Sequence, residues 1–311
     1  MLTKGDSYGD YVIEDHLDEG GHAHIYAVRH RISGTLHALK VLHSKRADIR
    51  RRFLAEGRTL MTLRHPNIVP VLEVIEHDEH PALVLEYVDG MALDHWINAG
   101  LHDWDEREPL IHGIIEGLGH AHAHGVIHRD LQPANVLVGT DANGKPIARL
   151  IDFGLAKDLA TDGTTRTGST LGTPGYMAPE QIRDSKDVDK RADLFSLGCV
   201  MYVLVCEAEP FDGPTDVAIF NATCEARYIS PERMAPDVPP AYHAAIRRCL
   251  AVDRDKRIAS VDALRRLLAG EPEPEPAVVA PPVKPSSNAG PAIATIVVLL
   301  VLALWGWLAQ S

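Results

Sequence analysis

The chain of 311 residues is poor in cysteine, carries no excess of positive charge and has no apolar run near its start. The formal net charge of -12 excludes broad nucleic-acid binding, which requires clustered lysine and arginine. The opening stretch MLTKGDSYGDYVIEDHL lacks a signal-peptide core, so we expect that the N-terminal domain is not exported. No CxxC pair is present, which predicts free thiols in a reducing compartment, at Cys199, Cys206, Cys224 and Cys249.

What the chain does have is an ordinary globular balance. Hydrophobic residues make up 45% and charged residues 24% of it, so it can bury a sizeable core. The length allows one large two-lobed domain and a tail. We find no internal repeat.

Short apolar segments alternate with turns in the first third of the chain. Strand patterns, which predict a hairpin meander, cover 11–17, 24–30 and 36–42. An amphipathic pattern predicts a helix over 45–64, ended by His65 and Pro66. Two more strands are expected over 68–76 and 81–88. Helical patterns then dominate, over 93–99, 107–124, 190–205, 216–226, 242–250 and 260–268.

The composition changes abruptly after Gly270. Residues 271–291 are rich in proline and acidic at their start, which predicts an extended, disordered linker. Residues 292–309 contain no charged side chain, and as a helix they would reach about 27 Å, close to the hydrocarbon thickness of a bilayer. A buried core helix is the alternative, but a core helix would not follow a disordered linker. We therefore expect a transmembrane tail anchor with no external sensor domain.

Three polar clusters lie between short apolar runs from Val126 to Glu180: HRDLQPAN, DFG and APE. Phosphoryl transfer from ATP needs a carboxylate to orient the attacking hydroxyl and oxygen ligands for Mg²⁺. Asp130, Asn135 and Asp152 supply one base and two ligands at a spacing that a loop and a hairpin can bring together. With these motifs in this order, the sequence resembles the bacterial-type, eukaryotic-like serine/threonine protein kinase family.

The resemblance covers residues 8–268 and implies an α+β, two-lobed protein-kinase-like fold. The β-rich N-lobe is expected over about 8–88 and the larger α-helical C-lobe over about 89–268. The implied activity is transfer of the ATP γ-phosphate to Ser/Thr hydroxyls of proteins, including the chain's own activation loop. Implied cofactors are ATP and Mg²⁺. Implied partners are protein substrates and a second copy for autophosphorylation, with no nucleic acid. The tail would place the chain in the cytoplasmic membrane, single-pass, with the kinase domain in the cytoplasm.

The resemblance also assigns roles to individual residues. Asp130 is the expected base, with Lys40 and Asn135 beside it, and Asn135 and Asp152 are the expected metal ligands. Lys40 is expected to pair with Glu56 in the active conformation. Leu85 is expected to line the inner pocket and Thr173 to lie near the docking loop of the protein substrate. The residues expected around the nucleotide are Leu17, Gly20, Gly21, Ile25, Ala38, Lys40, Glu56, Glu86, Val88, Gln132, Leu137 and Asp152.

Further residues match the architecture and regulation of the family. Asp193 is expected to brace the catalytic loop, and Glu180 with Arg257 to form a buried ion pair. His128 is expected to pack near Phe153 in an apolar stack that links the lobes. Arg129 matches an arginine on which a phosphorylated activation segment docks. The candidate acceptor hydroxyls in that segment belong to Thr164, Thr165, Thr167, Ser169 and Thr170.

The chain departs from the family pattern at two places. In the glycine-rich loop, Asp18 and Ala23 stand where the first and third glycines are expected. In the catalytic loop, Gln132 replaces the lysine that contacts the transferring phosphate, and it brings no positive charge. A pseudokinase that binds nucleotide and acts as a signalling scaffold is therefore the alternative function. A small-molecule kinase is disfavoured because GTPGYMAPE resembles a protein-substrate platform.

Seventeen histidines invite a metal-site interpretation, especially in HAHAHG. A spacing of two residues places His120 and His122 on different sides of a helix. We therefore interpret this stretch as part of a helix that leads into the catalytic loop.

Overall fold

The N-terminal strand patterns fold into one antiparallel sheet. The computed structural model describes residues 1–19, 23–44, 46–76, 80–100, 102–154, 173–183 and 188–271. The sheet has six strands in the order β1-β2-β3-β4-β6-β5. Their bounds are β1 Ser7–Tyr8, β2 Tyr11–Glu19, β3 Ala23–His30, β4 Leu36–Leu42, β5 Val71–Ile75 and β6 Ala82–Glu86.

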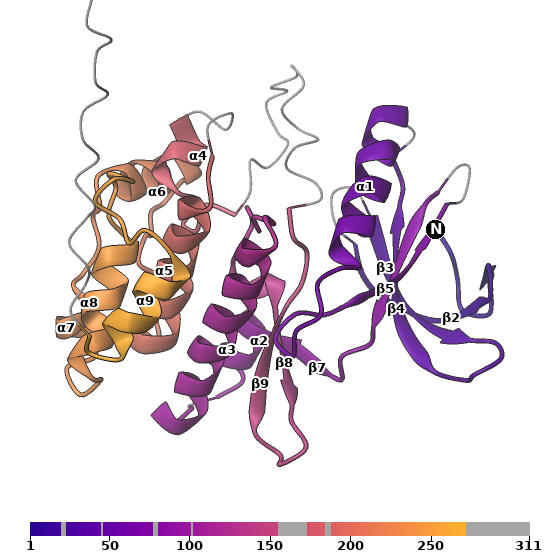
Figure 1. The fold of residues 1–311 in the computed structure, drawn as a ribbon, viewed down its shortest axis with the longest axis horizontal. Coiled ribbons are helices and arrows are strands. Elements are labelled where there is room, and N and C mark those ends of the chain that lie inside the picture. The colour runs from indigo at the N-terminus through magenta and orange to yellow at the C-terminus, as the bar shows by residue number, and fades with distance from the viewer. Residues whose placement is uncertain are drawn as a thin grey trace, which may run out of the picture. The chain divides into compact units, whose positions relative to one another are not determined.

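Strand alternation gives this sheet two apolar faces. Leu39 and Val41 on β4 lie in a core with Val84 of β6, whereas Leu83 faces the opposite core. Helix α1 (Ala47–Leu60) buries Phe53 against that second face, beside the sheet in Figure 1. Because successive side chains of a strand point to opposite faces, the alternation directs Lys40 towards the α1 side.

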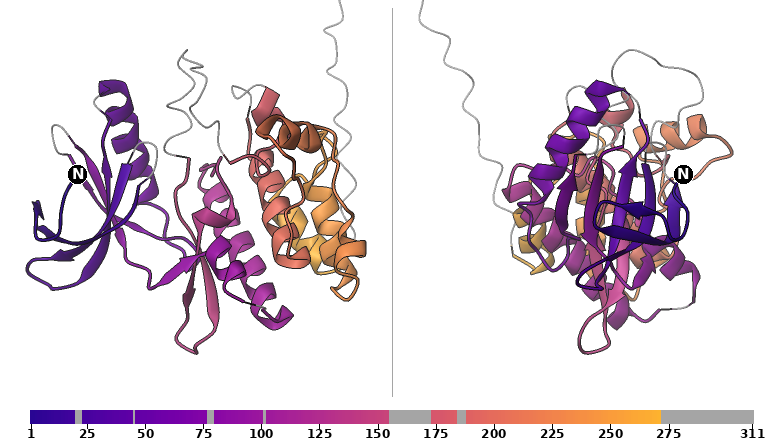
Figure 2. Two further views of the ribbon diagram at one scale, coloured as in Figure 1. Left: turned by 180° about the vertical axis from the view of Figure 1, so that it is seen from behind. Right: turned by 90° about the vertical axis from the view of Figure 1, so that its right-hand side faces the viewer.

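The second half of the chain is mostly helical, as predicted. Its first elements are β7 Gly90–Ala92, α2 Leu93–Asn98, α3 Trp104–Ala123, the 3₁₀ turn η1 Pro133–Asn135, β8 Val136–Thr140 and β9 Pro146–Leu150. The later helices are α4 Pro179–Arg183, α5 Arg191–Cys206, α6 Asp216–Cys224, α7 Pro231–Met234, α8 Pro240–Cys249 and α9 Val261–Leu268. Helix α5 is buried from residue 192 to 206 and contacts α3 and α8 (Figure 1 and Figure 2).

Residues 67–69 connect the two halves. Leu150 N donates to Asn67 O at 2.8 Å, and Val69 N donates to Leu150 O at 3.0 Å, so the segment extends the edge of β9. Asn67 Nδ2 also donates to Ala148 O at 2.8 Å. On α3, Gly117 leaves room for this segment, because a Cβ there would lie 2.7 Å from Asn67 O. The N-terminal half is thus docked on β9 and α3 through main-chain contacts.

The predicted elements agree with the structure except at their ends. The expected helix over 45–64 is α1, which begins at Ala47 and ends at Leu60. The strands β1, β7, β8 and β9 and the short helices α4 and α7 were not predicted, and β1 and β7 carry too few residues to show a period. Residues Met1–Glu273 form one compact unit. Among the described helices none is long and apolar enough to cross a membrane. The predicted linker after Glu271 and the predicted transmembrane helix over 292–309 lie outside the described residues.

Candidate active site

The Asp193 side chain on α5 holds the main chain of the catalytic loop, HRDLQPAN, in place. This carboxylate on α5 is fully buried and accepts the backbone N–H groups of His128 and Arg129, both at 2.7 Å. It also bonds to His122 Nε2 on α3 at 2.7 Å. Three donors around one buried carboxylate fix the loop's main chain. The brace is the contact that the resemblance implies for Asp193; the part of His122 in it was missed, although its place in the helix before the loop was predicted.

Amide side chains hold Asp130 on both carboxylate oxygens. Asn135 Nδ2 donates to Asp130 Oδ2 at 3.2 Å and to its backbone oxygen at 2.7 Å. Gln132 Nε2 donates to Oδ1 at 3.3 Å. Asn135 also connects this loop to the DFG segment, because its backbone oxygen accepts Ile151 N at 3.0 Å. The candidate base and the two candidate metal ligands are therefore brought together.

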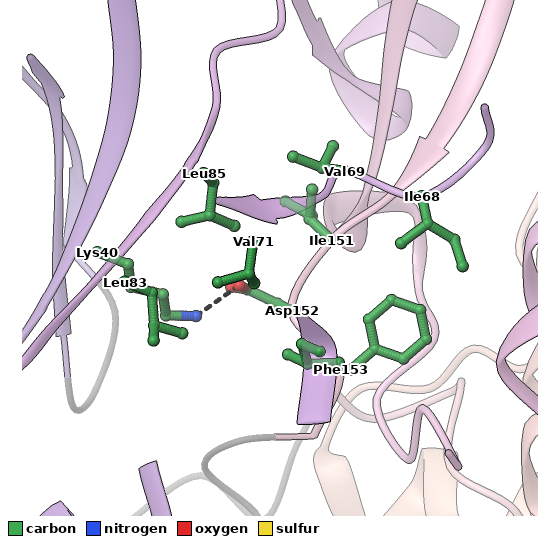
Figure 3. Close-up of a pocket in the computed structure, with 10 residues that line it drawn as sticks. Lys40, Ile68, Val69, Val71, Leu83, Leu85, Ile151, Asp152 and Phe153 are labelled. Atoms are coloured by element: carbon green, nitrogen blue, oxygen red, sulfur yellow. Dashed lines mark hydrogen bonds and ion pairs between the residues drawn. The ribbon is translucent and has the colours of Figure 1, made fainter. Parts of the chain in front are cut away.

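Lys40 forms its ion pair with Asp152. The distance from Lys40 Nζ to Asp152 Oδ1 is 2.5 Å, and the side chains are 14% and 29% exposed. Figure 3 shows the pair at the edge of a small cavity lined by apolar side chains, among them Leu83, Leu85 and Phe153. The expected pair between Lys40 and Glu56 is not among the ion pairs of the described residues. Lys40 instead neutralises a carboxylate of the DFG segment.

The residues expected around adenine share one face of the sheet. Ile25 lies opposite Lys40, and Ala38 lies opposite Leu85, so cross-strand register places all four side chains on the same side. Across from them, Leu137 lies on β8. Leu17 is exposed on β2, and Gly20 and Gly21 lie outside the described residues.

The hinge carries an ion pair that sequence reasoning missed. Glu86, at the end of β6, accepts a hydrogen bond from Arg149 on β9 at 2.5 Å. Val88 follows two residues later and lies beside β8, because a Cβ on Gly139 would meet it at 3.3 Å. The hinge is therefore fastened to the small sheet of β7, β8 and β9. Alternation along β9 could have suggested that Arg149 faces outwards, but not which carboxylate it meets.

The DFG and HRD segments each contain a residue with a strained backbone. Asp152 has φ 56° and Arg129 has φ 62°, both in the left-handed region that non-glycine residues rarely adopt. Gly154 N donates to His128 O at 2.8 Å, and a Cβ on Gly154 would lie 2.9 Å from that oxygen. Only glycine permits this approach, so the DFG and HRD segments are locked together. Strain of this kind is common at functional sites.

His128 packs against Phe153, as predicted, with ring centroids 4.6 Å apart. Burial lowers the pKa of His128, and the carboxylates of Asp193, Asp130 and Asp152 oppose this only in part. The neutral imidazole is therefore the form that the folded protein favours.

The expected architectural ion pair is present at the other end of the site. Arg257 donates to both oxygens of Glu180, at 2.6 and 2.9 Å, and its own side chain is completely buried. Beside the pair, Gln181 Nε2 donates to Arg129 O at 3.0 Å, a contact that sequence reasoning did not identify. Helix α4 is thus connected both to the segment between α8 and α9, through Arg257, and to the catalytic loop, through Arg129.

The predicted activation segment and glycine-rich loop are only partly covered by the described residues. Thr173 is exposed, whereas the candidate acceptors from Thr164 to Thr170 lie outside the described residues. Asp18 is exposed and lies opposite Ile25, with its carboxylate accepting the N–H of Glu19 at 2.8 Å.

Comparison with known proteins identifies the family. The protein kinase domain matches residues 11–268. The chain is 37% identical over 271 residues to the DNA damage-responsive serine/threonine-protein kinase RqkA of Deinococcus radiodurans, which covers 84% of this chain and 39% of that protein. It is 34% identical over 250 residues to the serine/threonine-protein kinase PrkC of Bacillus subtilis, covering 79% of this chain and 38% of that protein. The chain thus spans about two fifths of the length of these curated relatives.

Solved structures show the same fold. A crystal structure of Rad53 in complex with AMP-PNP matches with a TM-score of 0.68 and 26% identity, covering 82% of this chain and 64% of that chain. The PknI kinase domain of Mycobacterium tuberculosis matches with a TM-score of 0.67 and 24% identity, covering 87% of this chain and 99% of that domain. The resemblance predicted from the three motifs is confirmed. The chain therefore belongs to the protein kinase family, among the bacterial-type, eukaryotic-like serine/threonine kinases.

Proposed function

We propose that this protein transfers the γ-phosphate of ATP to Ser/Thr hydroxyls of proteins. The observation that carries the proposal is one connected set of contacts. Asn135 bonds to Asp130 and, through its main chain, to Ile151, and the next residue, Asp152, pairs with Lys40. A hydroxyl-orienting carboxylate, oxygen ligands and a phosphate-binding ammonium are thus assembled from three separate segments: the catalytic loop, the DFG segment and β4.

Each residue has a distinct part in this reaction. Asp130 orients the substrate hydroxyl and accepts its proton. Lys40 holds the nucleotide phosphates, with Ile25, Ala38 and Leu137 around the adenine.

The donor set fits Mg²⁺. Asn135 uses its amide nitrogen for Asp130, which leaves the amide oxygen for a metal ion, and Asp152 uses Oδ1 for Lys40. Asn135 and Asp152 are therefore the residues that would hold the ion, and hard oxygen ligands are the kind that Mg²⁺ prefers. A bound ion would neutralise phosphate charge.

A protein substrate is supported by the segment after the DFG motif and by the relatives. Thr173 is exposed and lies three residues before Tyr176, which is buried with Met177 and Ala178. Such an exposed threonine on an anchored platform suits a docking loop for a polypeptide. The two curated relatives are named as serine/threonine-protein kinases, and Rad53 binds AMP-PNP in its crystal structure.

Phosphate incorporation from γ-labelled ATP with Mg²⁺ tests the proposal. The full chain and its Asp130→Asn variant are compared, with a generic basic protein as acceptor and phosphoamino-acid analysis of the product. We expect labelled phosphoserine or phosphothreonine from the wild type and a loss of at least about a hundredfold in the variant. Equal incorporation in both would refute the role of Asp130.

The scaffold alternative is favoured by two observations. Gln132 adds no charge to the site, and Asp18 lies opposite Ile25, on the face where the adenine is expected. Binding of ATP without any transfer, in the same assay, would support the scaffold function instead.

We also propose that residues 292–309 tether the protein to the cytoplasmic membrane and that two copies phosphorylate each other in the activation segment. The support is the uncharged sequence of the tail and the hydroxyl-rich stretch TDGTTRTGSTLGT. Carbonate extraction of membranes from expressing cells tests the tether. The full chain should stay with the membrane and a chain truncated after Glu271 should not; equal fractionation would refute it.

A further inference from the structure

We propose that Gln132 is a positioning residue that orients Asp130 through a hydrogen bond from its uncharged amide. The inference rests on the proposed kinase activity and concerns one of the residues at which this sequence departs from the family pattern. The contact that motivates it is the donation from Gln132 Nε2 to Asp130 Oδ1 at 3.3 Å.

The backbone determines the direction of this side chain. Gln132 is extended, with φ -158° and ψ 164°, as expected for a residue that precedes a proline. Its backbone oxygen accepts Asn135 N at 2.9 Å, which closes the turn η1. Leu131 is completely buried, whereas Asp130 and Gln132 on either side of it are partly exposed. Asp130 and Gln132 therefore emerge on the same side of the loop, within reach of each other.

The two amides divide the carboxylate between them. Asn135 donates to Oδ2 and Gln132 to Oδ1, so rotation of the Asp130 carboxylate would break both bonds. The two distances, 3.2 and 3.3 Å, lie at and just beyond the long end of the usual range for N–H···O, so each bond is of modest strength. These bonds fix the orientation of the Asp130 carboxylate, and a base that turns away from the substrate hydroxyl catalyses the transfer more slowly. A glutamine meets this need without any charge.

A positioning role and a phosphate-binding role predict different kinetics. If Gln132 mainly contacted the nucleotide, its removal would raise the KM for ATP. If it orients Asp130, its removal lowers kcat and leaves the KM for ATP unchanged, because the lost interaction acts on the chemical step.

Three substitutions separate these roles in the full chain. Gln132→Ala removes the donor, Gln132→Glu keeps the size but replaces the donor by a carboxylate, and Gln132→Lys keeps a donor of similar reach. We expect kcat to fall by about tenfold for Ala and by more for Glu, with the KM for ATP within about twofold of wild type. Lys should keep kcat at or above the wild-type value. Lys145→Ala, on an exposed turn, is the control.

The outcomes are distinguishable. Unchanged kcat in Gln132→Ala, or a KM for ATP that rises with the fall in kcat, overturns the positioning role while leaving the kinase activity established. A wild-type chain that transfers no phosphate overturns the proposed function and this role with it. Thermal unfolding midpoints equal to wild type are expected for all four variants, which excludes misfolding as the cause of a loss.

Discussion

Replacing Glu180 with alanine should leave the guanidinium of Arg257 buried without its carboxylate. The Arg257 side chain is 0% exposed and that of Glu180 16%. Two charge-assisted bonds, at 2.6 and 2.9 Å, would be lost. Arg257 keeps its bonds to the backbone oxygens of Arg191 and Ala251, at 2.7 and 3.0 Å, but these carry no full charge.

The expected cost follows from burial. Removing one partner of a buried ion pair typically costs about 3–5 kcal/mol, because the remaining charge is uncompensated. For a domain of this size, that lowers the unfolding midpoint by roughly 10 °C. Adding Arg257→Met to Glu180→Ala should recover part of the lost stability, because no unpaired charge then remains buried.

An exposed pair of the same geometry serves as control. Arg265 donates to both oxygens of Glu116 at 2.8 Å, but the side chains are 35% and 47% exposed. Glu116→Ala should therefore cost less than about 1 kcal/mol. The measurement is thermal and urea unfolding of the full chain, followed by circular dichroism. Equal losses for the two glutamate variants would refute the argument that burial, and not contact geometry, decides the energy.

Three further predictions concern the site and its support. Asp193→Asn should lower kcat by about tenfold or more in the phosphate-incorporation assay, with ATP binding by calorimetry unchanged, because an amide cannot accept three donors; an unchanged kcat would contradict the brace. Burial lowers the pKa of His128, so the unfolded chain binds its proton first, and stability should fall as the pH drops below about 6.5. His128→Phe should make the urea unfolding free energy depend less on pH in that range; an identical slope would count against it. Gly117→Ala should cost about 1–3 kcal/mol through its clash with Asn67 O, whereas Gly100→Ala, with nothing within 4 Å, should cost nothing measurable in the same unfolding assay.

Much of the N-terminal sheet could be predicted because its signals are local. The alternation around Lys40 shows which face the lysine takes, since neighbouring residues of a strand point to opposite sides. Asp130 and Asn135 lie in one short loop, so their proximity follows from sequence spacing alone. Short elements such as β7 were missed because three residues cannot show a period.

The sequence by itself therefore determined the family and the faces of the strands, and it indicated the candidate site residues. Tertiary structure decided which groups pair across long separations. Lys40 bonds to Asp152, 112 residues away, and not to the expected Glu56, and His122 joins Asp193 across 71 residues. The hinge residue Glu86 meets Arg149 across 63 residues. A charged side chain pairs with a carboxylate that the packing of strands and helices brings close to it. The order of residues along the chain does not specify that packing, so it does not predict these pairs.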